Sequence, residues 1–414
     1  MLALKMGGLK VVFLVLGVLM FAIPCSYGVS VACMAVYDEG GAPAVFKSPE
    51  CHDWVLSAKA GHNETMNCQF ESTKGRRRYQ EDRISCNLDM KIPLLGENGL
   101  EDVRVGVVAV FDGHIGQEAS EMASKLVLDY IFAHSMFGSF KNWLSLKEEQ
   151  NTASQNSNED VELEPHKATL GSRSFEGISE VILDGSTRMG ILKRALVKTI
   201  KDIDSSFTEA TLENDLAAGS TAVVVLLVDG QILVANVGDS KALLCSEKHP
   251  PRQEADGASI PYLSVKELTS DHNPHRDEER ARIEAAGGVI SGYRSHDMLV
   301  INGHFPMTRA LGDVPLKRYG IISDPEVTDW QPLTANDSYL VVASDGIFES
   351  LKPQKVCNLL RDAHFQDSKQ SASCLELSSL ANCIVRNAFE KGSTDNLSAV
   401  VVPLRSAGFF LAKP

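Results

Sequence analysis

Two short apolar runs end in the same way, and this repetition constrains the fold more than any other feature of the chain. VRVGVVAVF is followed by Asp112-Gly113-His114, and SYLVVAS is followed by Asp345-Gly346. Runs rich in β-branched residues and bounded by Asp-Gly predict buried strands that end in turns. A turn is the simplest interpretation of either pair alone, so the rest of the chain must decide whether these carboxylates have a further role.

The remaining pattern predicts antiparallel strands with helices between groups of them. Two apolar runs, STAVVVLLV and ILVANVG, flank Asp229-Gly230, a pair favoured in two-residue hairpin turns. Helical spacing follows Gly116, and another helix is expected between Pro274 and Gly287. Strands joined by hairpins, with helices between them, predict one α+β domain.

The charge balance and the cysteines exclude some classes of protein. Acidic residues outnumber basic ones, 54 to 40, and the net charge of -14 argues against a nucleic-acid surface. The nine cysteines include no CxxC pair, which argues against a zinc or thioredoxin-like site. Free buried thiols are expected, although Cys51, Cys68 and Cys86 could pair in an oxidising compartment.

The N-terminal segment predicts targeting. Lys5 and Lys10 precede the apolar run VVFLVLGVLMFAI, and no charge occurs from Val11 to Tyr37. Residues 1–37 are therefore expected to be either a cleaved signal peptide or a retained anchor, with membrane association through 11–37. The expected location is the secretory pathway or a membrane, and the side on which the rest of the chain lies stays open.

After this segment, the chain is expected to divide into three parts. A linker over 38–60 leads into a folded domain over 61–404, and a tail follows over 405–414. An acidic stretch rich in Ser and Asn, over 145–188, is expected to be an insertion rather than core.

Carboxylates recur at strand ends and in tight loops. They come from four places: Glu81-Asp82, Asp112, Asp345 and Asp395. Carboxylates that cluster repel one another unless a cation lies between them. A ligand set made only of oxygen atoms suits Mg²⁺ or Mn²⁺, whereas zinc would require His or Cys at ligand spacing.

Nine motifs occur in the order in which they occur in the metal-dependent protein phosphatase 2C family. They are GRRRYQED, VFDGHIGQEAS, AAGSTAVV, VANVGDSKALL, LTSDHNP, EERARIEAAGGVI, TRALGD, VASDGIFE and STDNLSAVVV. The chain resembles this family from Gly61 to Leu404, and its plant members in particular. The resemblance implies an α+β fold, a four-layer α/β/β/α sandwich with two central antiparallel sheets.

The resemblance also implies an activity, the hydrolysis of phosphoserine and phosphothreonine in proteins by a metal-activated bridging water. Two Mg²⁺ or Mn²⁺ ions are expected, with a weaker third ion possible in some members. Asp112 would bridge both ions, and Glu81 with the Gly113 carbonyl would complete the second. Asp345 and Asp395 would hold the first ion.

The remaining roles follow from the same resemblance. His114 is expected to be the general acid, and Arg77 to hold the phosphate. Asp82 would orient the ligands and water from behind them, and Asp271 would contribute to a third ion. Three further residues are expected to shape turns or loops rather than bind metal: Asp239, Asp313 and Asn396.

One motif departs from the family pattern. The family usually reads close to NGxLAVSRAxGD, whereas this chain has INGHFPMTRALGD. Pro306 cannot donate a ladder hydrogen bond, so this strand is expected to be an edge or to be interrupted. Thr308 stands where a serine is usual.

Two other functions compete with catalysis. A pseudophosphatase would keep the fold and bind phosphoproteins without turnover, but the presence of all the expected catalytic residues argues against it. A secreted calcium-binding domain is less favoured, because the chain has no EF-hand loop. The expected partners are phosphoprotein substrates, with no nucleic acid, and a monomer is expected.

Overall fold

The structure is a computed structural model. It describes residues 35–37, 43–45, 68–96, 99–156, 185–214, 216–248, 262–293, 295–364 and 379–408. The predicted signal segment and linker lie outside the described residues, apart from β1 (Ala35–Tyr37) and β2 (Pro43–Val45), which pair with each other. These strands belong to one compact unit, Met1–Glu64, and the rest of the fold belongs to a second, Thr65–Pro414. No helix in the described ranges is long and apolar enough to cross a bilayer.

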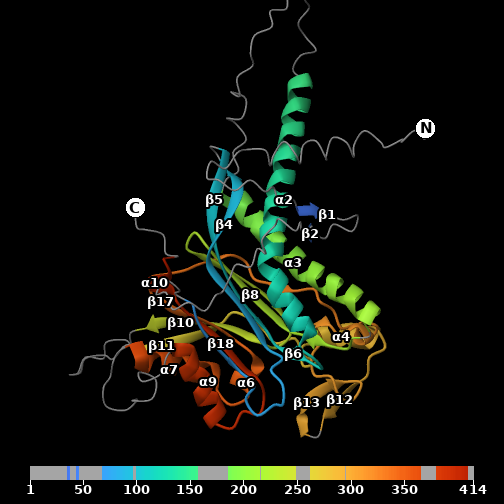
Figure 1. Ribbon diagram of the computed structural model, residues 1–414, viewed down its shortest axis with the longest axis vertical. Helices are drawn as coiled ribbons and strands as arrows, with labels where there is room; N and C mark the ends of the chain where they lie inside the picture. The colour runs from blue at the N-terminus through green and yellow to red at the C-terminus, as the bar shows by residue number, and fades with distance from the viewer. Residues whose placement is uncertain are drawn as a thin grey trace, which may run out of the picture. The chain divides into compact units, whose positions relative to one another are not determined.

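Two antiparallel sheets form the centre of the second unit (Figure 1). The first sheet has the strand order β15-β9-β8-β5-β4, with β16 paired to β9. Its strands are β15 (Glu326–Val327), β9 (Gln231–Val237), β8 (Ala222–Val228), β5 (Gly99–Phe111), β4 (Arg83–Gly96) and β16 (Gln331–Pro332). The second sheet has the order β11-β10-β17-β18-β3. Its strands are β11 (Tyr262–Glu267), β10 (Lys241–Lys248), β17 (Asp337–Ala343), β18 (Leu397–Pro403) and β3 (Gln69–Thr73).

Alternate residues of the central strands enter different cores. Along β5, Val107 and Ala109 belong to the core under one helical layer, whereas Val108 belongs to the core between the sheets. Along β17, Val341 faces the other helical layer and Leu340 faces the first sheet. Because successive side chains of a strand point to opposite faces, strands that are apolar throughout must be covered on both sides.

Helices cover both outer faces. The helices α2 (Glu118–Asn156) and α3 (Gly185–Asn214) share the core of the first sheet. Three helices share the core of the second sheet: α6 (Asp345–Phe348), α7 (Pro353–His364) and α9 (Leu380–Glu390). Figure 1 shows these layers on the two sides of the sheets. The predicted four-layer α/β/β/α sandwich is therefore confirmed.

Both long helices enter the range predicted as an insertion. Helix α2 continues to Asn156 and α3 begins at Gly185, so both ends of the predicted range 145–188 are helical. The stretch KNWLSLKEEQ consists largely of good helix formers, and it extends α2 although it is polar. Residues 157–184 lie outside the described residues.

Smaller elements complete the domain. The predicted hairpin turn is confirmed, because both Asp229 (φ 47°) and Gly230 (φ 71°) have the positive φ angles of a type I′ turn. The predicted helix near Pro274 is α4 (Asp277–Ala285). Pro306 lies in no strand, so the predicted interruption is confirmed. The remaining elements are β6 (Gly113–His114), β7 (Gly219–Ser220), β12 (Ile290–Tyr293), β13 (Ser295–Ile301), β14 (Leu311–Gly312), α5 (Val314–Lys317) and α10 (Leu404–Ala407).

The expectation of free thiols is wrong for the cysteines that the structure pairs. Cys68 is bonded to Cys86, one of the pairings left open above, and Cys245 is bonded to Cys357. The second bond joins β10 to α7, with Cα atoms 5.6 Å apart across a sequence separation of 112 residues. Spacing along the chain could not predict it, because packing of a helix on a sheet brings the two sulfurs together.

Candidate active site

The predicted carboxylates meet where strands of the two sheets end. Asp112 follows β5, Asp345 follows Ser344 at the end of β17, and Asp395 lies just before β18. Strands β17 and β18 are neighbours in one sheet and contact β5 of the other. The two apolar strands that end in Asp-Gly therefore place the carboxylates of Asp112 and Asp345 close together.

Asp112, Asp82 and Asp345 form a buried group of acids. The three side chains lie close enough for the charges of Asp82 and Asp345 to act on Asp112. Burial raises the pKa of Asp112 well above its ordinary value, and the charges of Asp82 and Asp345 raise it further. Burial also raises the pKa of Asp82 to about 6, and burial together with the charge of Asp395 raises that of Asp345. Each of these carboxyl groups therefore disfavours the ionisation of its neighbours.

Glu81 lies beside this group and ties two segments together. Its Oε1 accepts a hydrogen bond from the Gly116 N–H at 2.7 Å, and its own N–H donates to Asn396 Oδ1 at 2.8 Å. A side chain at Gly113 would collide with the Glu81 carbonyl, so only glycine permits this approach. The predicted role of Asn396 is confirmed, because its amide also donates to the carbonyls of Lys74 and Tyr79.

The three consecutive arginines differ in their contacts. Arg77 donates to Asp395 Oδ2 at 2.6 Å, and its side chain is 53% exposed. Arg76 instead donates to the Ser393 carbonyl and lies over the ring of Phe389. Arg77 is thus paired with one of the predicted metal ligands.

His114 has a partner that sequence reasoning missed. Its Nε2 lies 2.7 Å from Oδ2 of Asp313, whose side chain is only 1% exposed. Burial lowers the pKa of His114, but the hydrogen bond and charge of Asp313 outweigh burial and raise it above its ordinary value. Gly219 lies directly against the pair, because a Cβ there would strike both His114 and Asp313. The interpretation of Asp313 as a mere turn residue is incomplete.

The segment that carries Asp313 is anchored at both ends. At its start, buried Glu279 of α4 accepts from Thr308, and the guanidinium groups of Arg309 and Arg282 pair with it. Near its end, Asp204 of α3 accepts from the Gly312 N–H at 2.8 Å. Asp204 also holds two later residues, Lys317 and Ser323. These contacts anchor the chain before and after Asp313.

Asp239 belongs to the acidic group, which its interpretation as a turn residue did not anticipate. Burial and the charges of Asp345 and Asp271 raise its pKa to about 7. Its loop is fixed by His272, whose N–H donates to the Gly238 carbonyl at 3.0 Å and whose Nδ1 accepts from the Gly238 N–H at 3.1 Å. Asp271, the residue predicted for a third ion, instead pairs with Lys241.

The donor set fits hard divalent cations. All its members are carboxylate oxygens, and several carry raised pKa values that a neighbouring cation would lower again. Within the described residues, no three His, Cys, Asp or Glu side chains already stand as an assembled ligand cluster. The carboxylates are therefore neighbours whose side chains would have to turn toward an ion.

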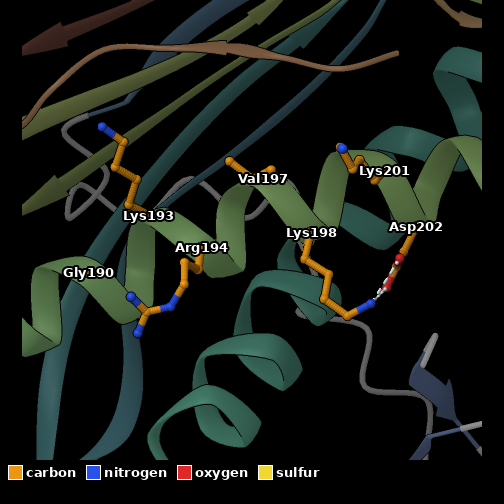
Figure 2. Close-up of a pocket in the computed structure, with 7 residues that line it drawn as sticks. All are labelled: Gly190, Lys193, Arg194, Val197, Lys198, Lys201 and Asp202. Carbon is orange, nitrogen blue, oxygen red and sulfur yellow. Dashed lines mark hydrogen bonds and ion pairs between the residues drawn. The ribbon is translucent and has the colours of Figure 1, made fainter. Parts of the chain in front are cut away.

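A separate hollow lies along α3 (Figure 2). It has a volume of about 570 Å³ and is lined by Gly190, Lys193, Arg194, Val197, Lys198, Lys201 and Asp202. None of these residues belongs to the acidic group. Its lysines already pair with carboxylates, Lys193 with Asp329, Lys198 with Asp202 and Lys201 with Asp324.

Comparison with known proteins identifies the family. The family model for protein phosphatase 2C matches residues 180–397. "Probable protein phosphatase 2C 51" of Arabidopsis thaliana is 41% identical, with 96% of this chain and 82% of that protein covered. A phosphatase 2C relative from Oryza sativa subsp. japonica is 39% identical, with 92% of this chain and 85% of that protein covered.

A solved structure shares the fold. The crystal structure of serine-threonine phosphatase 2C from Toxoplasma gondii aligns with a TM-score of 0.56 and 21% identity, covering 81% of this chain and 94% of that one. The family model begins after Glu81, Asp112 and His114, but the alignment with the Arabidopsis relative covers nearly the whole chain. By its sequence and its sandwich fold, this chain belongs to the protein phosphatase 2C family.

Proposed function

We propose that the chain removes phosphate from phosphoserine and phosphothreonine in proteins, with two Mg²⁺ or Mn²⁺ ions held by the acidic group. Family membership supports protein phosphatase activity. The finer assignment is supported by the position of Asp112, which is buried where the charges of both Asp82 and Asp345 act on it. This central position of Asp112 is the observation that carries the proposal.

Each acidic residue has a distinct task in this proposal. Asp112 and Glu81, with the Gly113 carbonyl, would hold one ion, and Asp345 and Asp395 would hold the other with Asp112. Asp82, which accepts from Ser344 at 2.9 Å, would keep Asp112 and Asp345 oriented. When bound, the ions would supply positive charge against the phosphate oxygens and make water a better nucleophile.

Two further side chains act on the substrate. Arg77, which is half-exposed beside Asp395, would grip two phosphate oxygens with its guanidinium fork. His114 would give its proton to the departing serine or threonine oxygen, which is too basic to leave as an alkoxide. Asp313 would hold the imidazole so that the proton faces the substrate.

Calorimetric titration with Mn²⁺ tests the metal site independently of turnover. Asp112→Asn should weaken binding strongly, because it removes the central carboxylate of the group. Asp324→Asn serves as a matched control, because Asp324 is an exposed acid that pairs with Lys201. Equal binding by the wild type and Asp112→Asn would contradict the proposed ligand set.

We propose further that the catalytic unit folds in an oxidising compartment, reached through the apolar N-terminal segment. The bonds Cys68–Cys86 and Cys245–Cys357 support this location, because such bonds persist in oxidising surroundings. Asn336 of the Asn-Asp-Ser sequence is exposed in a turn, where a glycan would be tolerated. Loss of a mass shift on glycosidase treatment in Asn336→Gln would support this location. Absence of any glycan on the wild type would argue against it.

A further inference from the structure

Ile115 has a backbone conformation that an isoleucine disfavours. Its φ angle is 58°, in the left-handed region. Four non-glycine residues in the described ranges have positive φ angles, and the other three are Asp229, Asn302 and Asp313. Asp and Asn tolerate this region, whereas a β-branched side chain clashes with its own backbone there. Ile115 is therefore the strained member of the set.

The neighbours of Ile115 impose this conformation. On one side, His114 pairs with Gly219 in the short ladder of β6 and β7. On the other side, the Gly116 N–H donates to Glu81 Oε1 at 2.7 Å. A strained residue persists where its surroundings determine its backbone in this way, and such residues gather at functional sites.

The side chain of Ile115 is not stabilised by burial. It is 66% exposed, and it belongs to none of the buried cores. Asparagine or glycine would adopt the same backbone with less strain and would expose no apolar surface. Neither the fold nor the backbone geometry accounts for a large aliphatic side chain at this position.

A second exposed apolar side chain belongs to the segment that Glu81 joins to this turn. Tyr79 is 73% exposed and lies two residues before Glu81. Its backbone is fixed, because the Asn396 amide donates to the Tyr79 carbonyl at 2.9 Å. The hydrogen bond between Glu81 and Gly116 therefore connects two segments that each expose a large apolar residue beside the acidic group.

We propose that Ile115, together with Tyr79, forms an apolar subsite for the residue next to the phosphorylated serine or threonine of a protein substrate. The inference rests on the proposed function, in which His114 protonates the departing oxygen. Ile115 follows His114 directly, and consecutive Cα atoms lie about 3.8 Å apart in both enzyme and substrate. A substrate residue adjacent to the reacting one is thus within reach of Ile115.

Two phosphopeptides that differ only beside the phosphothreonine test the subsite. One has leucine on both sides of phosphothreonine and the other has asparagine. The wild type should prefer the leucine peptide by roughly tenfold in kcat/KM, as expected for an apolar contact. Ile115→Asn should reduce this ratio nearly to one, and Ile115→Leu should retain it.

The variants also separate this role from a structural one. Asparagine relieves the strain, so the melting temperature of Ile115→Asn should not fall below that of the wild type. Hydrolysis of p-nitrophenyl phosphate, which has no flanking residues, should be unchanged. Leu100→Asn is a matched control, because Leu100 is 60% exposed at the end of β5 opposite to Asp112.

The outcomes distinguish the subsite from the proposed function. If the wild type hydrolyses both peptides and Ile115→Asn keeps the same preference, the subsite is overturned alone. If the wild type hydrolyses both peptides without preference, the subsite is likewise overturned alone. If the wild type hydrolyses neither peptide, the proposed function is contradicted and the subsite with it.

Discussion

The Asp313 carboxylate lies 2.7 Å from Nε2 of His114, although 199 residues separate the two in the chain. Asp313 reaches this position in the left-handed conformation, with φ 48° and ψ 37°, directly before α5. Asp204 and Glu279 hold the segment on either side. The pair therefore depends on contacts from two helices that contribute nothing else to the site.

Asp313→Asn should impair proton donation more than substrate binding. The amide cannot hold the protonated imidazole as a carboxylate does, so kcat for a phosphothreonine peptide should fall roughly 100-fold. KM should change little. Hydrolysis of p-nitrophenyl phosphate should fall much less, because its leaving group needs no proton. Equal losses on both substrates would show that Asp313 supports the fold rather than His114.

Glu279→Gln should destabilise the domain in a pH-dependent way. Burial alone would raise the pKa of Glu279, but hydrogen bonds from Arg282, Arg309 and Thr308 outweigh it and hold the pKa well below its ordinary value. Removing one partner of a buried ion pair leaves the others uncompensated, so the variant should lose about 3 kcal/mol at pH 7.

The sign of this pH dependence follows from the lowered pKa. Glu279 stabilises the fold above the ordinary glutamate pKa of about 4.3, and the contribution declines as the pH falls below it. The difference in unfolding free energy between wild type and Glu279→Gln should therefore shrink from pH 7 toward pH 3. Glu284→Gln, on the exposed side of α4, is the control and should show no difference. A constant difference across this range would contradict the account.

Asp239 and Asp271 should differ in their effect on metal binding. Asp239 is buried, and the charges of Asp345 and Asp271 raise its pKa further, whereas Asp271 pairs with Lys241. Asp239→Asn should therefore change the Mn²⁺ concentration needed for half-maximal activity, and Asp271→Asn should leave it almost unchanged. A larger effect of Asp271→Asn would contradict this expectation and would support the sequence-based assignment of a third ion to that residue.

The bond between Cys245 and Cys357 should stabilise the protein measurably. A cross-link that closes a loop of about 100 residues contributes on the order of 4 kcal/mol by restricting the unfolded chain. Urea unfolding without dithiothreitol, which would also reduce Cys68–Cys86, should reveal a loss of this size in Cys245→Ser/Cys357→Ser relative to the wild type. Peptide mapping that finds both thiols free in protein from its native compartment would contradict the bond.

Features that depend on local pattern could be predicted from the sequence. The buried strand around Val108 and the Asp229-Gly230 turn require only neighbouring residues, and both appear as predicted. Asp112 and Asp345 were also found, because each directly follows a buried strand. The strands and the carboxylates that follow them are thus encoded in short segments, whereas the four-layer arrangement was predicted from the family resemblance.

Features that depend on distant segments could not be predicted from local pattern. Asp313 looked like a turn residue, because its neighbours reveal nothing of His114. Cys245 and Cys357 gave no spacing signal, since β10 and α7 meet only after folding. The length of α2 was also missed, because a polar sequence that suits an exposed helix resembles one that suits a loop.

The most direct test of the central claim is phosphate release from a phosphothreonine peptide by the full chain. It should be measured with Mn²⁺ or Mg²⁺, with chelator, and with Asp345→Asn alongside. The account predicts release that requires the metal and that Asp345→Asn abolishes. A folded wild-type protein that binds Mn²⁺ but releases no phosphate would contradict the account and would favour a phosphoprotein-binding module on the same fold.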